Sequence, residues 1–171
     1  MERLNFGCGN NIKRGWVNVD KQEGEGINKS FDFNKFPYPF KKDSFDYVLI
    51  DNVLEHLEKP VEVIKELHRI CKKNAIIEII VPYYNTYYAY VDVTHLHFFN
   101  EDTFYNLFEG NKYDIKKKNL FKVLEVNSIP QRYLRWIPKP ILNVLKRFLG
   151  NIIVNLNVKV RVIKLNTPLS P

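Results

Sequence analysis

The chain of 171 residues is predicted to form a doubly wound α/β fold whose sheet is mostly parallel and ends in an antiparallel carboxyl-terminal strand. Short apolar, β-branched segments alternate with helical patterns, as they do in parallel sheets. A glycine turn, Gly7-Cys8-Gly9, directly follows the first of these segments, where a parallel strand would end. Residues 158–161 alternate apolar and basic side chains, which favours an antiparallel strand near a sheet edge with one solvated face.

Each element is expected where the hydrophobic pattern has the right period. Strands are expected over residues 3–6, 16–20, 27–31, 47–51, 75–81, 121–128 and 158–165. The clearest helix is expected to begin at Pro60, a residue favoured at the first helical position, and to end at a cap formed by Asn74. Its apolar stripe consists of Val61, Ile64, Leu67 and Cys71. A second helix is expected over residues 101–108, before Gly110.

The connection between the first two strands is unusually short. Only residues 10–19 separate Gly9 from Asp20, whereas a parallel crossover normally needs about a dozen residues or more. We therefore expect the first crossover helix to be missing or cut to one turn near residues 11–14. Dinucleotide folds place the acidic residue about 20 positions after the glycine turn. The short link therefore favours a cofactor without a pyrophosphate, which has less need of a helix dipole.

The composition indicates one globular domain over residues 1–171, with a cofactor-binding core over 1–110. Two cysteines make no disulfide framework and no Cys-x-x-Cys zinc motif, so a reducing cytoplasm is expected. The net charge of +7 is concentrated in residues 111–171, which hold 13 Lys and Arg but two acidic residues. Such an excess indicates an anionic neighbour, namely phosphate, a lipid headgroup or nucleic acid, or else a solvated basic surface.

An amphipathic helix is expected over about residues 140–156, because its apolar positions recur on one helical face. Two arrangements fit this pattern. The helix either packs on the sheet or lies on an anionic membrane surface, with Arg135 and Trp136 at its entry. Prolines and basic residues within it exclude a membrane span.

Acidic residues close successive strands after the glycine turn. Asp20 ends the second expected strand, where a carboxylate can accept hydrogen bonds from both ribose hydroxyls. Asp32 follows the third strand, and Asp51 closes the fourth. The fourth strand leads directly into Asn52-Val-Leu-Glu-His-Leu57. A strand, a glycine turn and an acidic strand end together indicate a nucleotide-binding, Rossmann-like arrangement.

In this order and register, the motifs of residues 4–57 resemble those of class I S-adenosylmethionine-dependent methyltransferases, in particular the small type 11 group. The resemblance extends to about residue 104. It implies S-adenosyl-L-methionine as the cofactor, with Gly7 and Gly9 along its methionine and ribose portions. It further implies that Asp20 holds the ribose hydroxyls and Asp32 the adenine amino group. The remaining residues placed in this cofactor site are Cys8, Asp51, Asn52, which would lie beside the methionine end, and His56.

A segment rich in histidine follows the fifth expected strand. Methyl transfer to a hydroxyl needs a general base, and histidine suits that task because its pKa lies near neutrality. We therefore predict His95 or His97 as the base, with Asp92 as an orienting carboxylate. The alternative is that either histidine packs under the cofactor loop. Glu55 and His56 would flank the pocket floor or serve as a structural helix cap.

A metal site built from Asp92, His95, His97 and His56 is a less favoured alternative. Two histidines at positions i and i+2 point to opposite sides of an extended segment. We therefore predict no metal ligand from the sequence. The neighbouring tyrosines form either a substrate wall or a lid: Tyr83, Tyr84, Tyr87, Tyr88 and Tyr90.

The sequence thus predicts a methyltransferase that acts on a hydroxyl of a glycan or a lipid-linked small substrate. A peripheral contact to an anionic membrane is one of the two arrangements of its basic helix. Two alternatives remain open. The basic region 111–171 would also suit an RNA- or ribosome-linked methyltransferase, whose nucleic-acid affinity would fall steeply with salt. A small chain with a trimmed crossover would also suit a non-catalytic partner subunit that keeps the fold.

Overall fold

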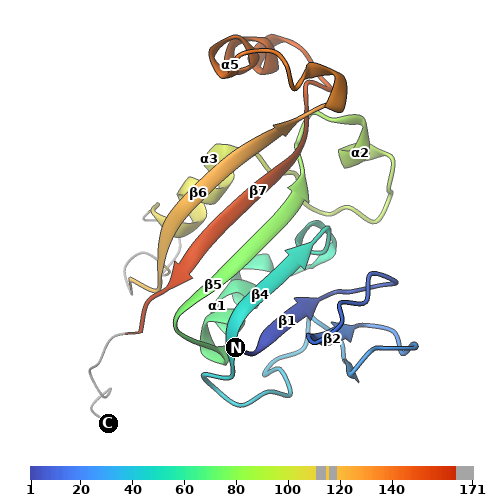
Figure 1. Cartoon of the computed structure of the whole chain (residues 1–171), viewed down its shortest axis with the longest axis vertical. Helices are drawn as coiled ribbons and strands as arrows, with labels where there is room; N and C mark the ends of the chain where they lie inside the picture. Colours follow the sequence, from blue (N-terminus) through green and yellow to red (C-terminus); the bar gives the residue numbers. More distant parts are fainter. Residues whose placement is uncertain (111–114, 116–118, 165–171) are drawn as a thin grey trace.

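Within the residues described by the computed structural model, which are 1–110, 115 and 119–164, seven strands form one mixed sheet (Figure 1). Their order across the sheet is β3-β2-β1-β4-β5-β7-β6. The first five strands are parallel, and β7 is antiparallel to both β5 and β6. The predicted fold class is thereby confirmed. The strands are β1 (Arg3–Phe6), β2 (Val17–Asp20), β3 (Lys29–Ser30), β4 (Phe45–Asp51), β5 (Cys71–Pro82), β6 (Phe121–Pro130) and β7 (Ile153–Val162).

The strand order reverses at β1, which pairs with β2 on one side and with β4 on the other. In open α/β sheets such a reversal leaves a crevice at the carboxyl ends of the two diverging strands. The residues that follow β1 and β4 therefore lie at the place where this fold binds its ligands. The glycine turn follows β1, and Asp51-Asn52 closes and follows β4.

The main core lies between the sheet and two helices on one of its faces, α1 (Pro60–Ile70) and α3 (Glu101–Phe108), both behind the sheet in Figure 1. Side chains of the strands alternate accordingly. In β7, for example, Val158 and Val160 are fully buried, whereas Lys159 between them is half-buried on the opposite face. The apolar face of α1 packs on the apolar side chains of the alternating strands, and this explains why the sheet face under the helices is shielded from solvent.

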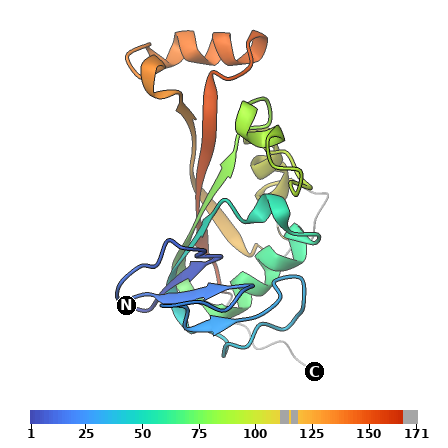
Figure 2. The same ribbon diagram turned by 90° about the vertical axis from the view of Figure 1, so that its right-hand side faces the viewer.

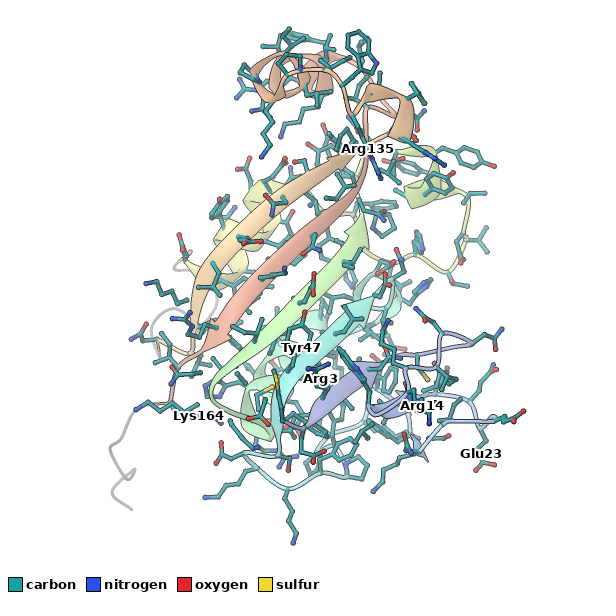
Figure 3. The ribbon with its side chains drawn as sticks, in the orientation of Figure 1. Arg3, Arg14, Glu23, Tyr47, Arg135 and Lys164 are labelled. Carbon is teal, nitrogen blue, oxygen red and sulfur yellow. The ribbon has the colours of Figure 1, made fainter. Side chains whose placement is uncertain are left out.

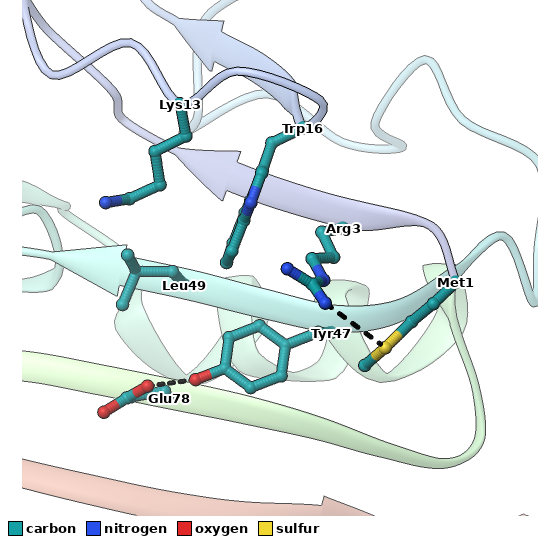
Figure 4. A pocket seen from close by; sticks show the side chains of 7 residues that line it. All are labelled: Met1, Arg3, Lys13, Trp16, Tyr47, Leu49 and Glu78. Atoms are coloured by element: carbon teal, nitrogen blue, oxygen red, sulfur yellow. Dashed lines mark hydrogen bonds between the residues drawn. The ribbon is translucent and has the colours of Figure 1, made fainter.

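The opposite face of the sheet carries a small pocket of about 400 Å³ (Figure 4). The indole of Trp16 stands edge-on to Tyr47, with the ring centroids 5.6 Å apart. The guanidinium of Arg3 lies 5.5 Å from the indole centroid. The Tyr47 hydroxyl donates a hydrogen bond to Glu78. This pocket lies across the middle of the strands, away from their carboxyl ends.

The first crossover has no helix, as predicted. Residues 7–16 run through turns, and side-chain amides fasten them to the sheet. Buried Asn5 donates to the Oδ1 of buried Asn18 at 2.9 Å and to the Asn11 carbonyl at 2.8 Å. The backbone N–H of Lys13 donates to the same Asn18 oxygen at 2.9 Å. These bonds satisfy the buried side-chain amides of Asn5 and Asn18.

The helix predicted from Pro60 to Asn74 is four residues too long. It ends at Ile70, and Cys71 is already the first residue of β5, paired with Phe45. Asn74 has a positive φ of 64° within β5 and is no helix cap. Cys71 fits the helical stripe and the buried strand equally well, so the pattern does not distinguish them. The predicted third strand, residues 27–31, shrinks to Lys29–Ser30.

The predicted helix over residues 140–156 is also too long. Helix α5 covers Lys139–Phe148, and β7 begins at Ile153 rather than at residue 158. The helix stops because Leu149 is extended and Asn151 adopts a left-handed φ of 60°. β7 lies inside the sheet, next to the edge strand β6, and residue 165 of the predicted strand lies outside the described residues.

Helix α5 stands apart from the core. Figure 2 shows it lying across the end of the β6–β7 pair, beyond the rest of the sheet. A short 3₁₀ helix, η2 (Arg132–Leu134), leads into it. Of the α5 side chains only Leu142 is buried. No helix among the described residues is long and apolar enough to cross a membrane.

Candidate active site

The glycine turn is shaped for close approach of a ligand. Gly7 and Gly9 both have positive φ angles, of 72° and 47°, which L side chains rarely adopt. A Cβ on Gly7 would stand 2.3 Å from Cγ2 of Val53, so only glycine fits there. The N–H groups of Gly7 and Cys8 both donate to the Val19 carbonyl at 2.9 Å, which fixes the turn against β2.

Asp20 closes β2 directly beside this turn. Its Oδ2 accepts the N–H of Gly9 at 2.7 Å, and its Oδ1 accepts the N–H of Gln22 at 3.1 Å. Each carboxylate oxygen keeps a further lone pair, and the residue is partly exposed. A carboxylate so oriented, next to a turn that a Cβ would close, fits the ribose diol of a nucleoside cofactor. Asp32, two residues beyond β3, is partly exposed and lies 3.8 Å from the Lys35 ammonium.

The end of β4 forms the other side of the crevice. Asn52 adopts a left-handed φ of 53°, and its side chain donates to Oδ1 of Asp51 at 2.9 Å. Burial raises the pKa of Asp51. Burial likewise raises the pKa of Cys8, so this thiol stays protonated near neutral pH. The structure thus brings the glycine turn, Asp20, Asp51 and Asn52 to one edge of the sheet.

A cavity of about 410 Å³ opens beside Asn52, and we call it the acceptor pocket. Four of its polar lining residues come from two separate segments. The 3₁₀ helix η1 (Leu54–His56) supplies Glu55 and His56, and the loop after α2 (Tyr87–Tyr90) supplies Asp92 and His95. The remaining lining residues are Pro82, Tyr88, Val154 and Asn155.

The two predicted histidine bases lie on different sides of their segment. His95 lines the acceptor pocket, and its Nδ1 lies 2.9 Å from the Ala89 carbonyl. His97 instead hydrogen-bonds the Leu57 carbonyl through Nε2 at 2.9 Å and lines a different cavity, between α1 and α3. The structure therefore brings His95 and Asp92 together and separates His97 from both, as the i, i+2 spacing implied.

Asp92 acts on His56 through an intervening hydroxyl. Oδ1 of Asp92 accepts from the Thr94 hydroxyl at 2.6 Å and from the Thr94 N–H at 2.8 Å. Nδ1 of His56 lies 2.9 Å from the same hydroxyl oxygen. Burial and the neighbouring His95 lower the pKa of His56. Asp92 was predicted to orient His95 or His97, but it reaches His56 instead, through the hydroxyl of Thr94. Thr94 was missed because a threonine carries no signal of its own.

Glu55 is the least expected member of the pocket. It is 1% exposed, and neither of its carboxylate oxygens has a hydrogen-bond partner among the described residues. Burial raises its pKa to about 7. Its backbone carbonyl accepts the N–H groups of Leu96 at 2.8 Å and His97 at 3.2 Å, which holds η1 against the histidine segment. The only feature of the sequence that indicated a role for Glu55 in the pocket was its position next to His56 directly after β4.

The tyrosine run divides between the two predicted roles. Tyr88 lines the acceptor pocket, as a substrate wall would. Tyr83 is buried and its hydroxyl donates to Glu101 at 3.1 Å, so it belongs to the core. Tyr87 and Tyr90 are exposed on α2.

Comparison with known proteins agrees with this architecture. Residues 8–79 match the type 11 family model, described as a methyltransferase domain. No curated protein matches the sequence. Among solved structures, an S-adenosylmethionine-dependent methyltransferase from Archaeoglobus fulgidus is similar at a TM-score of 0.66 and 18% identity, over 94% of this chain and 86% of that one.

Two further solved structures share the fold. One is an S-adenosylmethionine-dependent methyltransferase from Mesorhizobium loti, with a TM-score of 0.63, 12% identity and coverage of 94% and 90% of the two chains. The other is from Methanosarcina mazei, with a TM-score of 0.58, 15% identity and coverage of 96% and 93%. Residues 8–79 therefore match a methyltransferase domain, and the chain as a whole has the fold of class I S-adenosylmethionine-dependent methyltransferases, a family that implies S-adenosylmethionine as the co-substrate.

Proposed function

We propose that the chain methylates a hydroxyl group of an acceptor bound in the acceptor pocket. The observation that carries this proposal is the position of the pocket, whose wall includes Asn52 at the carboxyl edge of the sheet and whose floor is polar. S-adenosylmethionine, when bound, supplies an electrophilic methyl group for an in-line displacement. The protein then has to align the hydroxyl with it and to exclude water.

The residues at the sheet edge would hold the cofactor. The backbone of Gly7, Cys8 and Gly9 leaves room for its methionine and ribose portions. Asp20 accepts from the ribose hydroxyls and Asp32 from the adenine amino group. Asp51 and Asn52 lie beside the methionine end. His56, whose ring centroid lies 4.6 Å from that of His95, belongs to the acceptor side of the site.

We further propose that the acceptor is lipid-linked or a glycan presented at an anionic membrane. The support is the tip, residues 131–150, which contains η2 and α5. Its outward side chains are apolar and exposed, with Phe148 at 81% and Trp136 at 80%. Ile141 and Val144 lie on the same outward face of α5. An exposed apolar helical face of this kind is typical of interfacial helices.

Charge on the tip complements an anionic surface. The segment contains no Asp or Glu, and four of its cations are exposed: Arg132, Arg135, Lys139 and Arg147. Figure 3 shows Arg135 at the end of the molecule opposite Lys164. Each basic residue near an anionic membrane contributes about 1 kcal/mol of attraction.

The tip is fastened to the acceptor pocket. The N–H of Asn151 donates to the Asn85 carbonyl at 3.1 Å, and Oδ1 of Asn151 accepts from the N–H of Tyr87. Tyr87 begins α2, which supplies Tyr88 to the pocket. Val154, at the start of β7 directly after the tip, lines the same pocket. A headgroup held by the tip therefore lies next to the reacting groups.

The acceptor class is tested by incubating the purified chain with methyl-labelled cofactor and the lipid, glycan, RNA and protein fractions of cells. We expect label in the lipid or glycan fraction. Label confined to RNA would overturn the acceptor class and favour the RNA-linked alternative.

The cofactor placement is tested by titrating S-adenosylhomocysteine into Asp20→Ala. We expect its affinity to fall at least about tenfold, because charged hydrogen bonds of this kind contribute about 1.5–3 kcal/mol. Glu23→Ala, at an exposed position in the next loop, serves as the matched control. Equal affinity of both variants would contradict the assignment.

A further inference from the structure

Three potential ligands converge at the floor of the acceptor pocket. One side-chain atom each of Glu55, His56 and His95 lies within 4.8 Å of the other two. The two imidazole rings meet edge to face, with centroids 4.6 Å apart and planes inclined by 66°. Two histidines and a carboxylate are a recurrent donor set for divalent transition metals that keep open coordination positions.

The environment of Glu55 points independently to a cation. Both carboxylate oxygens are buried and have no hydrogen-bond partner among the described residues. An ionised carboxylate buried without a partner is strongly unfavourable, so such a group is either protonated or paired with a cation such as a metal ion. No lysine or arginine is among the residues that line the pocket, so only the histidines of its lining can supply a counter-charge.

Both imidazoles are held with Nε2 free to coordinate. Nδ1 of His95 faces the Ala89 carbonyl, which only accepts, so this nitrogen carries the hydrogen and Nε2 carries the lone pair. Nδ1 of His56 faces the Thr94 hydroxyl, whose own hydrogen is directed to Asp92, so it also donates. Neither Nε2 has a hydrogen-bond partner among the described residues. Fixing the far nitrogen in this way is the usual outer-shell arrangement around metal-bound histidine.

We propose that Glu55, His56 and His95 bind one divalent transition-metal cation such as Zn²⁺, whose open positions face the acceptor. Ligand atoms around zinc lie about 2.0–2.2 Å from the metal, hence about 3.3–3.6 Å from one another in a tetrahedral site, so binding draws the three side chains together by small rotations. This inference deepens the proposed function and rests on it for the role of the open positions.

The metal would activate the acceptor hydroxyl as a Lewis acid. The hydroxyl would release its proton to solvent when it binds the metal, before methyl transfer, and the oxygen lone pair would then form the bond to the methyl carbon. The carbon–sulfur bond of the cofactor breaks, its electron pair stays on sulfur, and S-adenosylhomocysteine leaves. Atoms and charge balance without any oxidant or reductant.

The test is calorimetric titration of the metal-free chain with Zn²⁺, together with thermal denaturation with and without Zn²⁺. We expect one site per chain, a rise of Tm with Zn²⁺, and an affinity at least tenfold weaker in Glu55→Gln and His95→Ala. Thr94→Val, which removes the outer partner of His56, should weaken binding about 10- to 100-fold. His97→Gln is the matched control and should bind as the unaltered chain does.

Glu55→Gln also reports on folding, because it removes a buried charge without changing the side-chain shape. Its metal-free Tm should therefore not fall, while its Tm no longer responds to Zn²⁺. Absence of a stoichiometric site, or equal binding by the Glu55, His95 and His97 variants, would overturn the metal site.

The experiments distinguish failure of the metal site from failure of the proposed hydroxyl methylation. Zn²⁺ binding lost in the ligand variants, combined with no label on any hydroxyl acceptor, supports the metal site and overturns the proposed function. Hydroxyl methylation that persists in the presence of a chelator, by a chain that binds no Zn²⁺, supports the function and overturns the metal.

Discussion

At the scale of single residues, Gly7 has a steric constraint that Gly15 lacks. Gly15 shares its positive φ, 76° against 72°, but a Cβ at Gly15 would meet open space. A comparison of alanine variants at Gly7 and Gly15 therefore distinguishes the cost of backbone strain from the cost of a collision with Val53. Alanine at either position incurs the strain, of about 1–3 kcal/mol.

We expect Gly7→Ala to destabilise the chain by roughly 1–3 kcal/mol more than Gly15→Ala, because a side chain must be forced into a filled site. Urea denaturation of the two variants measures the difference. The affinity for S-adenosylhomocysteine should fall in Gly7→Ala and hold in Gly15→Ala. Equal stabilities would show that Val53 moves aside without cost.

The residues of the crevice were predictable because strand ends fix their position. Gly7, Asp20 and Asn52 each follow or close a strand, and parallel strands bring those ends to one edge. Glu55 was not predicted as a central residue, because its importance depends on complete burial and on His95, which is 40 positions away. Neither property can be seen in a local pattern.

At the scale of elements, α3 and α5 are joined by one carboxylate. Glu101, the first residue of α3, accepts from Lys146 of α5 and from Ser128 of β6. Burial alone would raise the pKa of Glu101, but the hydrogen bonds from Lys146 and Ser128 outweigh it and lower the pKa below its usual value. Both partners of the ion pair are largely shielded from solvent.

A lowered carboxyl pKa makes the docking of α5 sensitive to acid. Its contribution is fully present above the unfolded-state pKa of about 4.3 and is lost as the pH falls through the lower folded-state value. We expect the protection of the α5 amides against hydrogen exchange, measured relative to the intrinsic exchange rate at each pH, to fall on acidification. The fall should correspond to a loss of about 1–2 kcal/mol of local stability.

Glu101→Gln should remove this acid dependence and expose α5 to exchange already at neutral pH. The control is Glu125→Gln, an exposed position on β6, which should leave the acid transition in place. An unchanged transition in Glu101→Gln would assign the acid sensitivity to another group.

Element existence was easier to predict than element ends. Helices at Pro60 and over 101–108 and all seven strands were identified, since their periods are clear. The carboxyl ends of α1 and α5 were misplaced, because Cys71 and Leu156 suit a helical stripe and a buried strand alike. Strand pairing with β4 and with β5 decides the outcome, and pairing is a long-range property.

At the scale of the whole molecule, the tip and the acceptor pocket lie on the same end of the sheet. The sequence indicated a basic, amphipathic segment but left open whether it packs on the sheet. In the structure α5 lies beyond the end of the β6–β7 pair, with Leu142 as its one buried side chain. The membrane arrangement is therefore the one to test.

We expect the chain to float with vesicles that contain anionic phosphatidylglycerol and to stay behind with neutral phosphatidylcholine. Phe148→Asp should abolish flotation, because it places a charge on the outward apolar face. Tyr105→Asp, at an exposed position on α3 away from the tip, should float normally. Failure to bind either vesicle would end the membrane proposal. RNA binding that weakens steeply with salt, without flotation, would favour the nucleic-acid alternative.

The strand that leaves the tip, β7, also limits which acceptors can react. Asn155 lines the acceptor pocket only two residues after β7 begins, and a strand rises about 3.3 Å per residue. When the tip is bound to a bilayer, this strand therefore fixes the distance between the membrane surface and the acceptor pocket. A hydroxyl close to the lipid headgroup lies at the height of the pocket and can react. A hydroxyl at the end of a long sugar chain lies too far from the membrane surface to enter the pocket.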